Sequence, residues 1–255
     1  MKNQKLLENA VGAIKKAGDI LLRIQRGTKE IKREGKDFLT KADLHSNSII
    51  VSRLRELTPR VPINSEEGDK NLNRTEKEIW IIDPLDGTVN FFHQDVFWGV
   101  SVAFVRNRQT ELGAIYLPAL DVLIGATRDG KIIKRGNFDF GVGKESDLSR
   151  AQVWLDWSKE SKAVLSILPK IAKVSLYPQI RLCATASLMA VATGKIVAYI
   201  HPHPAPEDFS AGYLIVEMAG GKVTDLAGRP CTPFSDSMVA SNGKLHNQIL
   251  EAVNN

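Results

Sequence analysis

The order of patterns along the chain predicts an α+β fold built in layers, rather than a doubly wound parallel sheet. An amphipathic helix opens the sequence, a run of strand-like stretches fills its middle, and strands and helices mix in its second half. At 255 residues the chain can form one large core. We therefore expect a single domain over 1–255, with sub-lobes of roughly 1–145 and 146–255.

Two helices are predicted at the start of the chain. Apolar residues recur at helical spacing in the first one, at Leu6, Leu7, Ala10, Val11, Ile14, Ala17 and Leu21. Charged residues interrupt them, so this segment lacks the apolar block of a secretory signal. The second helix is expected to begin near Ala42, and Thr58-Pro59 should end it after Leu57.

The middle of the chain reads as an antiparallel meander. A short strand is expected at 62–64, and the buried run EIWII at 78–82 should form a strand that stops at Asp83-Pro84. Further strands, separated by turn residues, are predicted at 98–106, 111–117, 122–127 and 131–134.

The second half mixes both kinds of element. Strands are predicted at 151–155 and 196–200. Helices are predicted near 159–172, 185–193, 208–219 and 243–253, with Gly220-Gly221 ending the third of them.

Composition indicates an ordinary soluble protein. Hydrophobic residues make up 43% and charged residues 25% of the chain, and no apolar run is long enough to cross a bilayer. Cys183 and Cys231 offer neither a disulfide framework nor metal-ligand spacing, so we expect a reducing, cytoplasmic location. The net charge of +5 comes from scattered basic residues, which argues against nucleic-acid binding.

The segment IIDPLDGT at 81–88 carries the most chemical information. An apolar strand delivers Asp83 and Asp86 at its exposed end, and Gly87 permits a tight turn into a short helix that begins at Thr88. Two such carboxylates can share hard divalent cations, and the amides at a helix start can bind phosphate. The alternative is a plain turn, because Asp-Pro and Asp-Gly are common turn formers.

Three further acidic positions bear on that choice. Glu66-Glu67 ends the preceding short strand, Asp43 lies at the start of the second helix, and Asp208 opens a later one. Each alone has an ordinary explanation, as a solvated pair or as a helix cap.

Taken in order, these segments resemble the inositol monophosphatase family. That family belongs to a wider group of lithium-sensitive, Mg²⁺-dependent phosphatases, with fructose-1,6-bisphosphatases and 3′-phosphoadenosine phosphatases. The resemblance rests on residues 40–43, Glu66-Glu67, 83–88, 181–194 and 208–221. It implies a layered αβαβα sandwich of the sugar-phosphatase type, with an N-terminal α+β lobe and a C-terminal α/β lobe that share one core, and it implies a homodimer.

The resemblance also implies a metal site. One Mg²⁺ would be held by Glu66, Asp83 and the carbonyl oxygen of Leu85, and a second by Asp83, Asp86 and Asp208. A third, weaker ion would accompany a mobile loop carrying Lys32 and Lys36, a segment that also reads as a solvated charged turn.

Catalytic and substrate roles follow from the same resemblance. Glu66 and the Thr88 hydroxyl would orient the attacking water, and Asp43 would accept a hydrogen bond from Thr88. The amides near Gly87 and Thr88 would bind phosphate. Contacts to the rest of the substrate would come from Asp86, Ala184, His201 and Asp208.

The sequence departs from the family pattern in three places. Glu207 precedes Asp208 where the family usually has Trp, which would add a carboxylate beside the metal site. His201 stands where animal enzymes carry a Glu that contacts substrate; alternatively, His201 and His203 lie in a proline-stiffened surface loop. The segment 134–151 also differs, in a region that borders the family's substrate pocket.

The leading hypothesis is therefore a Mg²⁺-dependent phosphatase of a small phosphorylated metabolite, such as inositol monophosphate or a sugar phosphate. One alternative is a 3′-phosphoadenosine-type nucleotide phosphatase. Another is a non-catalytic homologue that binds a phosphometabolite, which Glu207 motivates. A nucleic-acid-binding protein would need a clustered basic face, and the sequence shows none.

Overall fold

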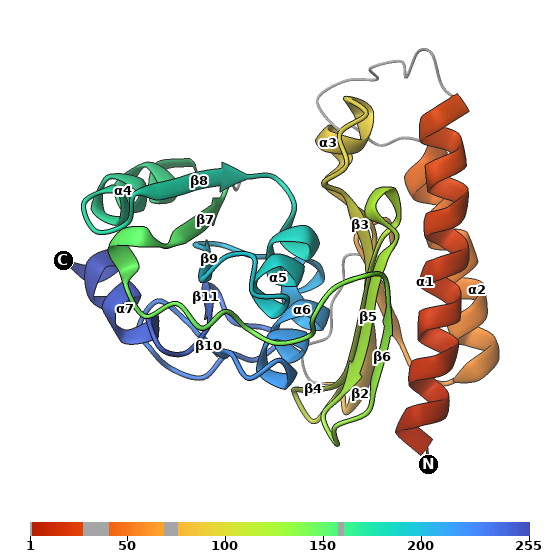
Figure 1. Cartoon of the computed structure of the whole chain (residues 1–255). Helices are drawn as coiled ribbons and strands as arrows, with labels where there is room; N and C mark the ends of the chain where they lie inside the picture. The colour runs from red at the N-terminus through yellow and green to blue at the C-terminus, as the bar shows by residue number, and fades with distance from the viewer. Residues whose placement is uncertain (1, 28–40, 69–75, 158–160) are drawn as a thin grey trace.

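The computed structural model of this chain describes residues 2–27, 41–68, 76–157 and 161–255. The predicted roles of Lys32 and Lys36, and of Thr40, lie outside the described residues. The elements stack as helices, sheet, helices, sheet and helices (Figure 1), which confirms the predicted αβαβα sandwich.

The first layer consists of α1 (Lys2–Gly27) and α2 (Lys41–Leu57). Leu7, Ile14 and Leu21 are fully buried on one face of α1, as their helical spacing predicts. They share an apolar core with Trp80 and other residues on one face of the first sheet. Figure 1 shows both helices on the side of this sheet that faces away from the second lobe.

The first sheet confirms the predicted meander. Its six strands run in chain order, with β1 and β2 parallel and all later neighbours antiparallel. Helices cover both faces, so its central strands are apolar throughout rather than alternating. The strands are β1 (Ile63–Ser65), β2 (Glu78–Asp86), β3 (Gly99–Arg106), β4 (Gln109–Leu117), β5 (Val122–Thr127) and β6 (Ile132–Arg135).

One predicted boundary in this sheet is wrong. β2 does not stop at Asp83-Pro84 but continues to Asp86. Asp83 pairs with Ser101 and Asp86 with Gly99, so one extra residue of β2 forms a bulge between the two carboxylates. Proline lacks a backbone N–H, and a bulge is one of the few places in a sheet that tolerates it. The short helix α3 (Thr88–Phe92) follows at once.

The middle layer holds α5 (Ala184–Ala192) and α6 (Pro206–Met218), both of which contribute to the core between the two sheets. α6 lies directly on β4. A Cβ atom added at Gly113 would come within 2.6 Å of the Ala211 carbonyl oxygen, so glycine is required for this approach.

The second sheet has the order β10-β11-β9-β7-β8. β7 is parallel to β8 and β9, and the other pairs are antiparallel. The outer face is covered by α4 (Ser161–Ala172) and α7 (His246–Asn254), which complete the third core. The strands are β7 (Gln152–Asp156), β8 (Tyr177–Arg181), β9 (Ala198–His201), β10 (Lys222–Thr224) and β11 (Met238–Ser241). β8, β10 and β11 were not predicted.

Short 3₁₀ helices at Pro118–Leu120 and Leu148–Arg150 complete the elements. Within the ranges that the structure describes, no helix is long and apolar enough to span a membrane.

Candidate active site

A cavity of about 470 Å³ opens where the two lobes meet. The first lobe supplies Glu66, which follows β1, and Asp86, Gly87 and Thr88 at the end of β2. The second lobe, including the starts of α5 and α6, supplies Asp156, Trp157, Leu182, Cys183, Ala184, His201, His203, Ala205 and Asp208. Val89 completes the lining.

The bulge in β2 sets the positions of Asp83 and Asp86. Asp83 is 1% exposed, and its carboxylate accepts a hydrogen bond from the Leu85 amide at 3.0 Å. Asp86 reaches across to the second lobe, where it accepts hydrogen bonds from the Thr185 amide at 2.5 Å and from the Cys183 thiol at 3.2 Å. Backbone amides therefore hold both carboxylates, of which Asp86 lines the cavity and Asp83 is buried and is not among the lining residues.

Gly87 makes the sharp turn between this strand and α3. Its φ is +80°, and an added Cβ atom would lie 2.9 Å from the carbonyl oxygen of Phe97. Both the left-handed backbone and the lack of space require glycine here. The hydroxyl of Thr88, one residue on, donates to the Leu85 carbonyl oxygen at 3.0 Å. The expected hydrogen bond from Thr88 to Asp43 would therefore need this hydroxyl to turn away from Leu85.

Asp43 and Asp208 each lie in the first turn of a helix. Asp43 is 3% exposed in α2, whose Ser46 donates to the Pro84 carbonyl oxygen at 2.7 Å and so ties α2 to the bulge. Asp208 is the third residue of α6 rather than its first, and it accepts a hydrogen bond from the Ala205 amide at 2.7 Å. It thereby closes the helix start as an acidic residue in a capping box does.

The acidic side chains influence one another strongly. Burial, followed by the charges of Glu66, Asp86 and Asp208, raises the pKa of Asp83 well above its usual range. Burial also raises the pKa of Asp86 to about 6, against the lowering effect of its hydrogen bonds from Thr185. The four carboxylates are therefore close enough to repel one another when ionised.

Glu66 belongs to the same group although the residue as a whole is exposed at the rim. Its carboxyl end is crowded by protein atoms, and this desolvation, with the charges of Asp208 and Asp86, raises the pKa of Glu66 to about 7.

The carboxylates of Glu66, Asp83, Asp86 and Asp208 are not arranged around one common point in this structure. Among the residues that the structure describes, no three His, Cys, Asp or Glu side chains stand close enough together to hold an ion. Asp83, Asp86 and Asp208 each accept a hydrogen bond from a backbone amide instead. The donor set nevertheless fits a hard divalent cation, because it consists of carboxylate oxygens whose repulsion a cation would relieve.

His201 is the last residue of β9 and is 4% exposed, so it does not lie in a surface loop; His203 does, and is exposed. The Nε2 atom of His201 lies 3.6 Å from Asp156 and 3.5 Å from Asp208. Sequence reasoning missed Asp156. The signal that could have found it is its place after the apolar strand 151–155, which matches the place of Asp83 after 78–82.

Glu207 was expected to add a carboxylate beside the metal site, but its side chain is engaged elsewhere. Its side chain accepts a hydrogen bond from the side chain of Asn64 in β1, so it ties the start of α6 to the first sheet. Its charge still contributes to the raised pKa of Glu66, as the smallest of the charges acting there.

The segment 134–151 also differs from expectation. Of the described residues that line the cavity, none belongs to this segment. Instead its backbone amides at Gly141 and Val142 donate to the carbonyl oxygens of Ala192 and Ala219, at the ends of α5 and α6.

A second cavity of about 350 Å³ adjoins the first and shares Trp157, Leu182 and Cys183 with it. Its walls are aromatic. The Arg181 guanidinium lies 5.1 Å from the ring centre of Phe97 and 4.6 Å from that of Trp154.

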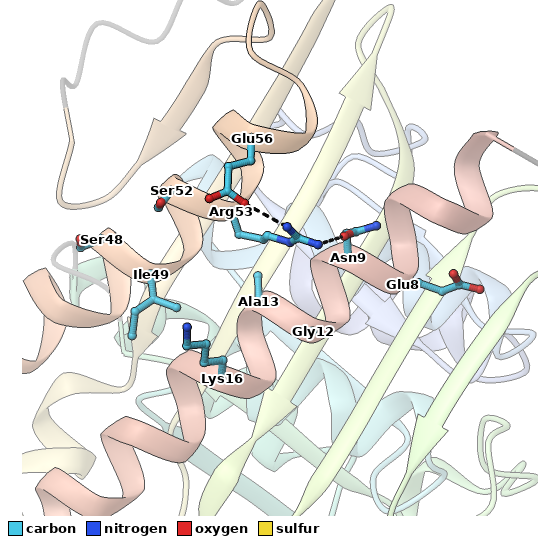
Figure 2. Close-up of a pocket in the computed structure, with 10 residues that line it drawn as sticks. All are labelled: Glu8, Asn9, Gly12, Ala13, Lys16, Ser48, Ile49, Ser52, Arg53 and Glu56. Carbon is cyan, nitrogen blue, oxygen red and sulfur yellow. Dashed lines mark hydrogen bonds and ion pairs between the residues drawn. The ribbon is translucent and has the colours of Figure 1, made fainter.

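A groove between α1 and α2 has a larger volume, about 630 Å³, and the described residues that line it all belong to these two helices (Figure 2). Figure 2 shows the Arg53 side chain reaching from α2 across the groove toward α1. Its guanidinium donates hydrogen bonds to Glu56 at 2.9 Å and to Asn9 at 2.5 Å. None of the predicted site residues lines this groove.

Comparison with known proteins shows that this chain is similar to inositol monophosphatases in sequence and in structure. The model of the inositol monophosphatase family matches residues 2–255. A "Fructose-1,6-bisphosphatase/inositol-1-monophosphatase" of Thermotoga maritima is 29% identical, over 97% of this chain and 95% of that protein. An "Inositol-1-monophosphatase" of Bacillus subtilis is 30% identical, over 88% of this chain and 86% of that protein. A solved inositol monophosphatase from Anabaena covers all of this chain and 97% of its own, with a TM-score of 0.87 and 26% identity.

Proposed function

Because the chain belongs to the inositol monophosphatase family, it is a phosphoric monoester hydrolase, and we propose that it requires Mg²⁺ and acts on inositol monophosphate or a sugar phosphate. One observation carries the proposal. Glu66, Asp86 and Asp208 come from three separate parts of the chain and line one cavity, and the charge of Asp208 raises the pKa of both Glu66 and Asp86. The charges of the same three groups raise the pKa of the buried Asp83. We also propose that residues 1–255 form one domain.

We propose that Glu66, Asp83 and the Leu85 carbonyl oxygen hold one Mg²⁺, and that Asp83, Asp86 and Asp208 hold a second. When bound, such ions neutralise the phosphate dianion and lower the pKa of a coordinated water. The amide hydrogen bonds that these carboxylates now accept would be exchanged for coordination, and Gly87 and Thr88 would present their backbone amides to the phosphate.

The remaining roles belong to the protein's own acids and bases. We propose that the carboxyl group of Glu66, at the rim of the cavity, accepts a hydrogen bond from the attacking water and takes up its proton. We propose that the Thr88 hydroxyl orients that water and that Asp43 fixes Thr88. We propose that Asp86, Ala184, His201 and Asp208 contact the alcohol portion of the substrate, and the support for this is that all four line the cavity.

The test is phosphate release from a panel of inositol, sugar and nucleotide phosphates, with Mg²⁺ and with a chelator. The proposal predicts turnover of inositol monophosphate or a sugar phosphate that depends on Mg²⁺. Binding of these compounds without turnover under any metal condition would instead identify a non-catalytic homologue.

A nucleotide phosphatase is the second candidate, and the cavity beside the site favours it. Trp154 and Trp157 line that cavity, and aromatic walls suit a nucleobase. In the same panel, preference for a nucleoside 3′-phosphate over inositol monophosphate would select this alternative.

We also propose a cytoplasmic homodimer. β8 is an edge strand, and exposed apolar side chains lie on and beside it and on α4: Trp157, Leu165, Val174, Leu176, Tyr177, Ile180 and Leu182. Such a face is a usual association surface. Light scattering should report a dimer for the unchanged chain and a monomer for Leu176→Asp. Leu44→Asp, at another exposed leucine on α2, is the matched control and should remain dimeric.

A further inference from the structure

A chain of buried polar side chains stands behind Asp208. The Tyr199 hydroxyl donates to one oxygen of Asp156 at 2.5 Å. The other oxygen of Asp156 lies 3.6 Å from Nε2 of His201, and the same nitrogen lies 3.5 Å from Asp208. Tyr199, Asp156 and His201 are 0%, 7% and 4% exposed, so all three side chains are held within the protein at the inner wall of the cavity.

The second sheet builds this chain through its register. β7 and β9 are parallel neighbours in which Trp154 pairs with Tyr199 and Leu155 with Ile200. Asp156 and His201, the final residues of the two strands, follow as the next positions at the same end. Tyr199 and His201 are two residues apart and therefore share one face of the sheet, and their rings make an edge contact at 6.1 Å.

Asp208 needs such support more than Asp83 and Asp86 do. Asp83 lies within a strand, and Asp86 is tied to α5 by two donors. Asp208 projects from the first turn of a helix, where it accepts a hydrogen bond from the nearby Ala205 amide. A contact to His201 from the second sheet fixes the side chain against a separate rigid element, as partners of metal ligands commonly do.

We propose that Asp156 is a positioning residue, which with Tyr199 orients His201 so that His201 holds the Asp208 carboxylate at the edge of the cavity, ready to bind a divalent cation. This inference rests on the proposed function. It assigns the Nε2 atom of His201 to the protein's own carboxylates rather than to the substrate.

The experiment is a calorimetric titration of the full chain with Mn²⁺ or Mg²⁺ alone, without substrate. Asp156→Asn keeps the shape of the side chain but removes its charge. It should weaken metal affinity by about 10- to 100-fold, the usual effect of losing a partner of a metal ligand. At saturating Mg²⁺, turnover should largely recover, because the ligands themselves are unchanged.

Asp225→Asn is the matched control. Asp225 is equally buried, at 7% exposed, and pairs with Arg229 at 2.6 Å, but it follows β10 at the far edge of the same sheet. Its substitution should leave metal affinity at the wild-type value. Tyr199→Phe removes only the hydroxyl that donates to Asp156, and it should also weaken metal affinity, but by less than Asp156→Asn does.

The outcomes separate the two proposals. A wild-type chain that binds no divalent cation would overturn the proposed function. A wild-type chain that binds the cation, with Asp156→Asn and Tyr199→Phe binding it equally well, would overturn this inference alone. If Asp156→Asn does not fold, Tyr199→Phe and His201→Gln decide the matter by the same titration.

Discussion

The two sheets contribute to the cavity in different ways. The first sheet is buried on both faces and delivers Asp83 and Asp86 from a bulge at the end of β2, where pairing with β3 fixes the backbone. The second sheet has shorter strands and delivers Asp156 and His201 from their ends. The expected ligands of the first lobe are thus held by main-chain geometry, whereas Asp208 depends on a relay of side chains.

The two sides of the cavity also differ in what their side chains are proposed to do, apart from Asp208, a proposed metal ligand that belongs to the second lobe. The DPLDGT segment belongs to the first lobe, and His201 and Asp156 belong to the second. Substitutions in the first lobe should therefore affect turnover itself, and substitutions in the second should adjust metal affinity or substrate choice.

The largest effect is expected from Asp86→Asn. The variant removes a proposed metal ligand, so kcat/KM should fall by more than about 100-fold, since losing even a partner of a metal ligand costs 10- to 100-fold. The metal-free fold should be as stable as wild type or more stable, because a buried acid with a raised pKa is replaced by a neutral side chain. Phosphate release and thermal unfolding measure the two effects, and unchanged turnover would contradict the metal assignment.

Buried groups in the two lobes, Asp86 and Glu66 in the first and His246 in the second, should affect stability in opposite directions as pH changes. In the first lobe the folded pKa values of Asp86 and Glu66 are raised from 3.8 to about 6 and from 4.5 to about 7. Their contribution to stability is therefore complete below the unfolded values and is lost as pH rises through about 6 and 7. Mg²⁺ should raise the unfolding midpoint strongly at about pH 8 and little at about pH 5, where the carboxyls hold protons.

His246 in the second lobe gives the opposite slope. It is buried between the hydroxyls of Thr224 and Ser241, each at 2.8 Å, and desolvation lowers its pKa from 6.5 to about 4. Its contribution to stability is present above the unfolded value and is lost as pH falls through about 4. His246→Gln should flatten this acid limb of the thermal-unfolding profile and leave the Mg²⁺ response unchanged.

A smaller effect is expected where the lobes are tied together. Asn64→Ala removes the side-chain amide that donates a hydrogen bond to Glu207. Loss of this hydrogen bond at a partly buried site should lower the free energy of unfolding by about 1–3 kcal/mol. Activity should fall by about tenfold at most, because Asp208 keeps its own contacts. Ser52→Ala, on α2 behind the first sheet, is the control and should leave steady-state kinetics unchanged.

The smallest effect is expected in the groove of Figure 2. Arg53 is half exposed and pairs with Glu56 within the same helix, so Arg53→Ala should cost less than about 1 kcal/mol of stability. Turnover should not change. A loss of activity here would show that α1 and α2 influence the site through the first sheet.

The first lobe could be predicted almost completely from the sequence, because long strands buried on both faces leave continuous apolar runs. The end of β2 was misplaced because Pro84 reads as a strand terminator, and only strand pairing reveals a bulge. In the second lobe β10 has three residues and β8 includes Pro178, so neither shows a clear strand pattern.

The candidate site was predictable where residues fall in one motif, and not where the fold brings distant segments together. Asp83, Asp86 and Asp208 stand in recognisable segments. The partnership of Asn64 with Glu207, which are 143 positions apart, depends on how α6 packs on the first sheet. Likewise, the burial of His201 depends on the register of β9, which prolines on either side of His203 concealed.

The close seating of α6 on β4 has a consequence for the whole cavity. Since Gly113 admits no side chain beneath Ala211, the helix that carries Asp208 rests on the backbone of the sheet that carries Asp83 and Asp86. This contact acts as a fixed spacer between the two halves of the proposed metal site. A single methyl group added at Gly113 would widen the gap between the carboxylates, although it would touch none of them.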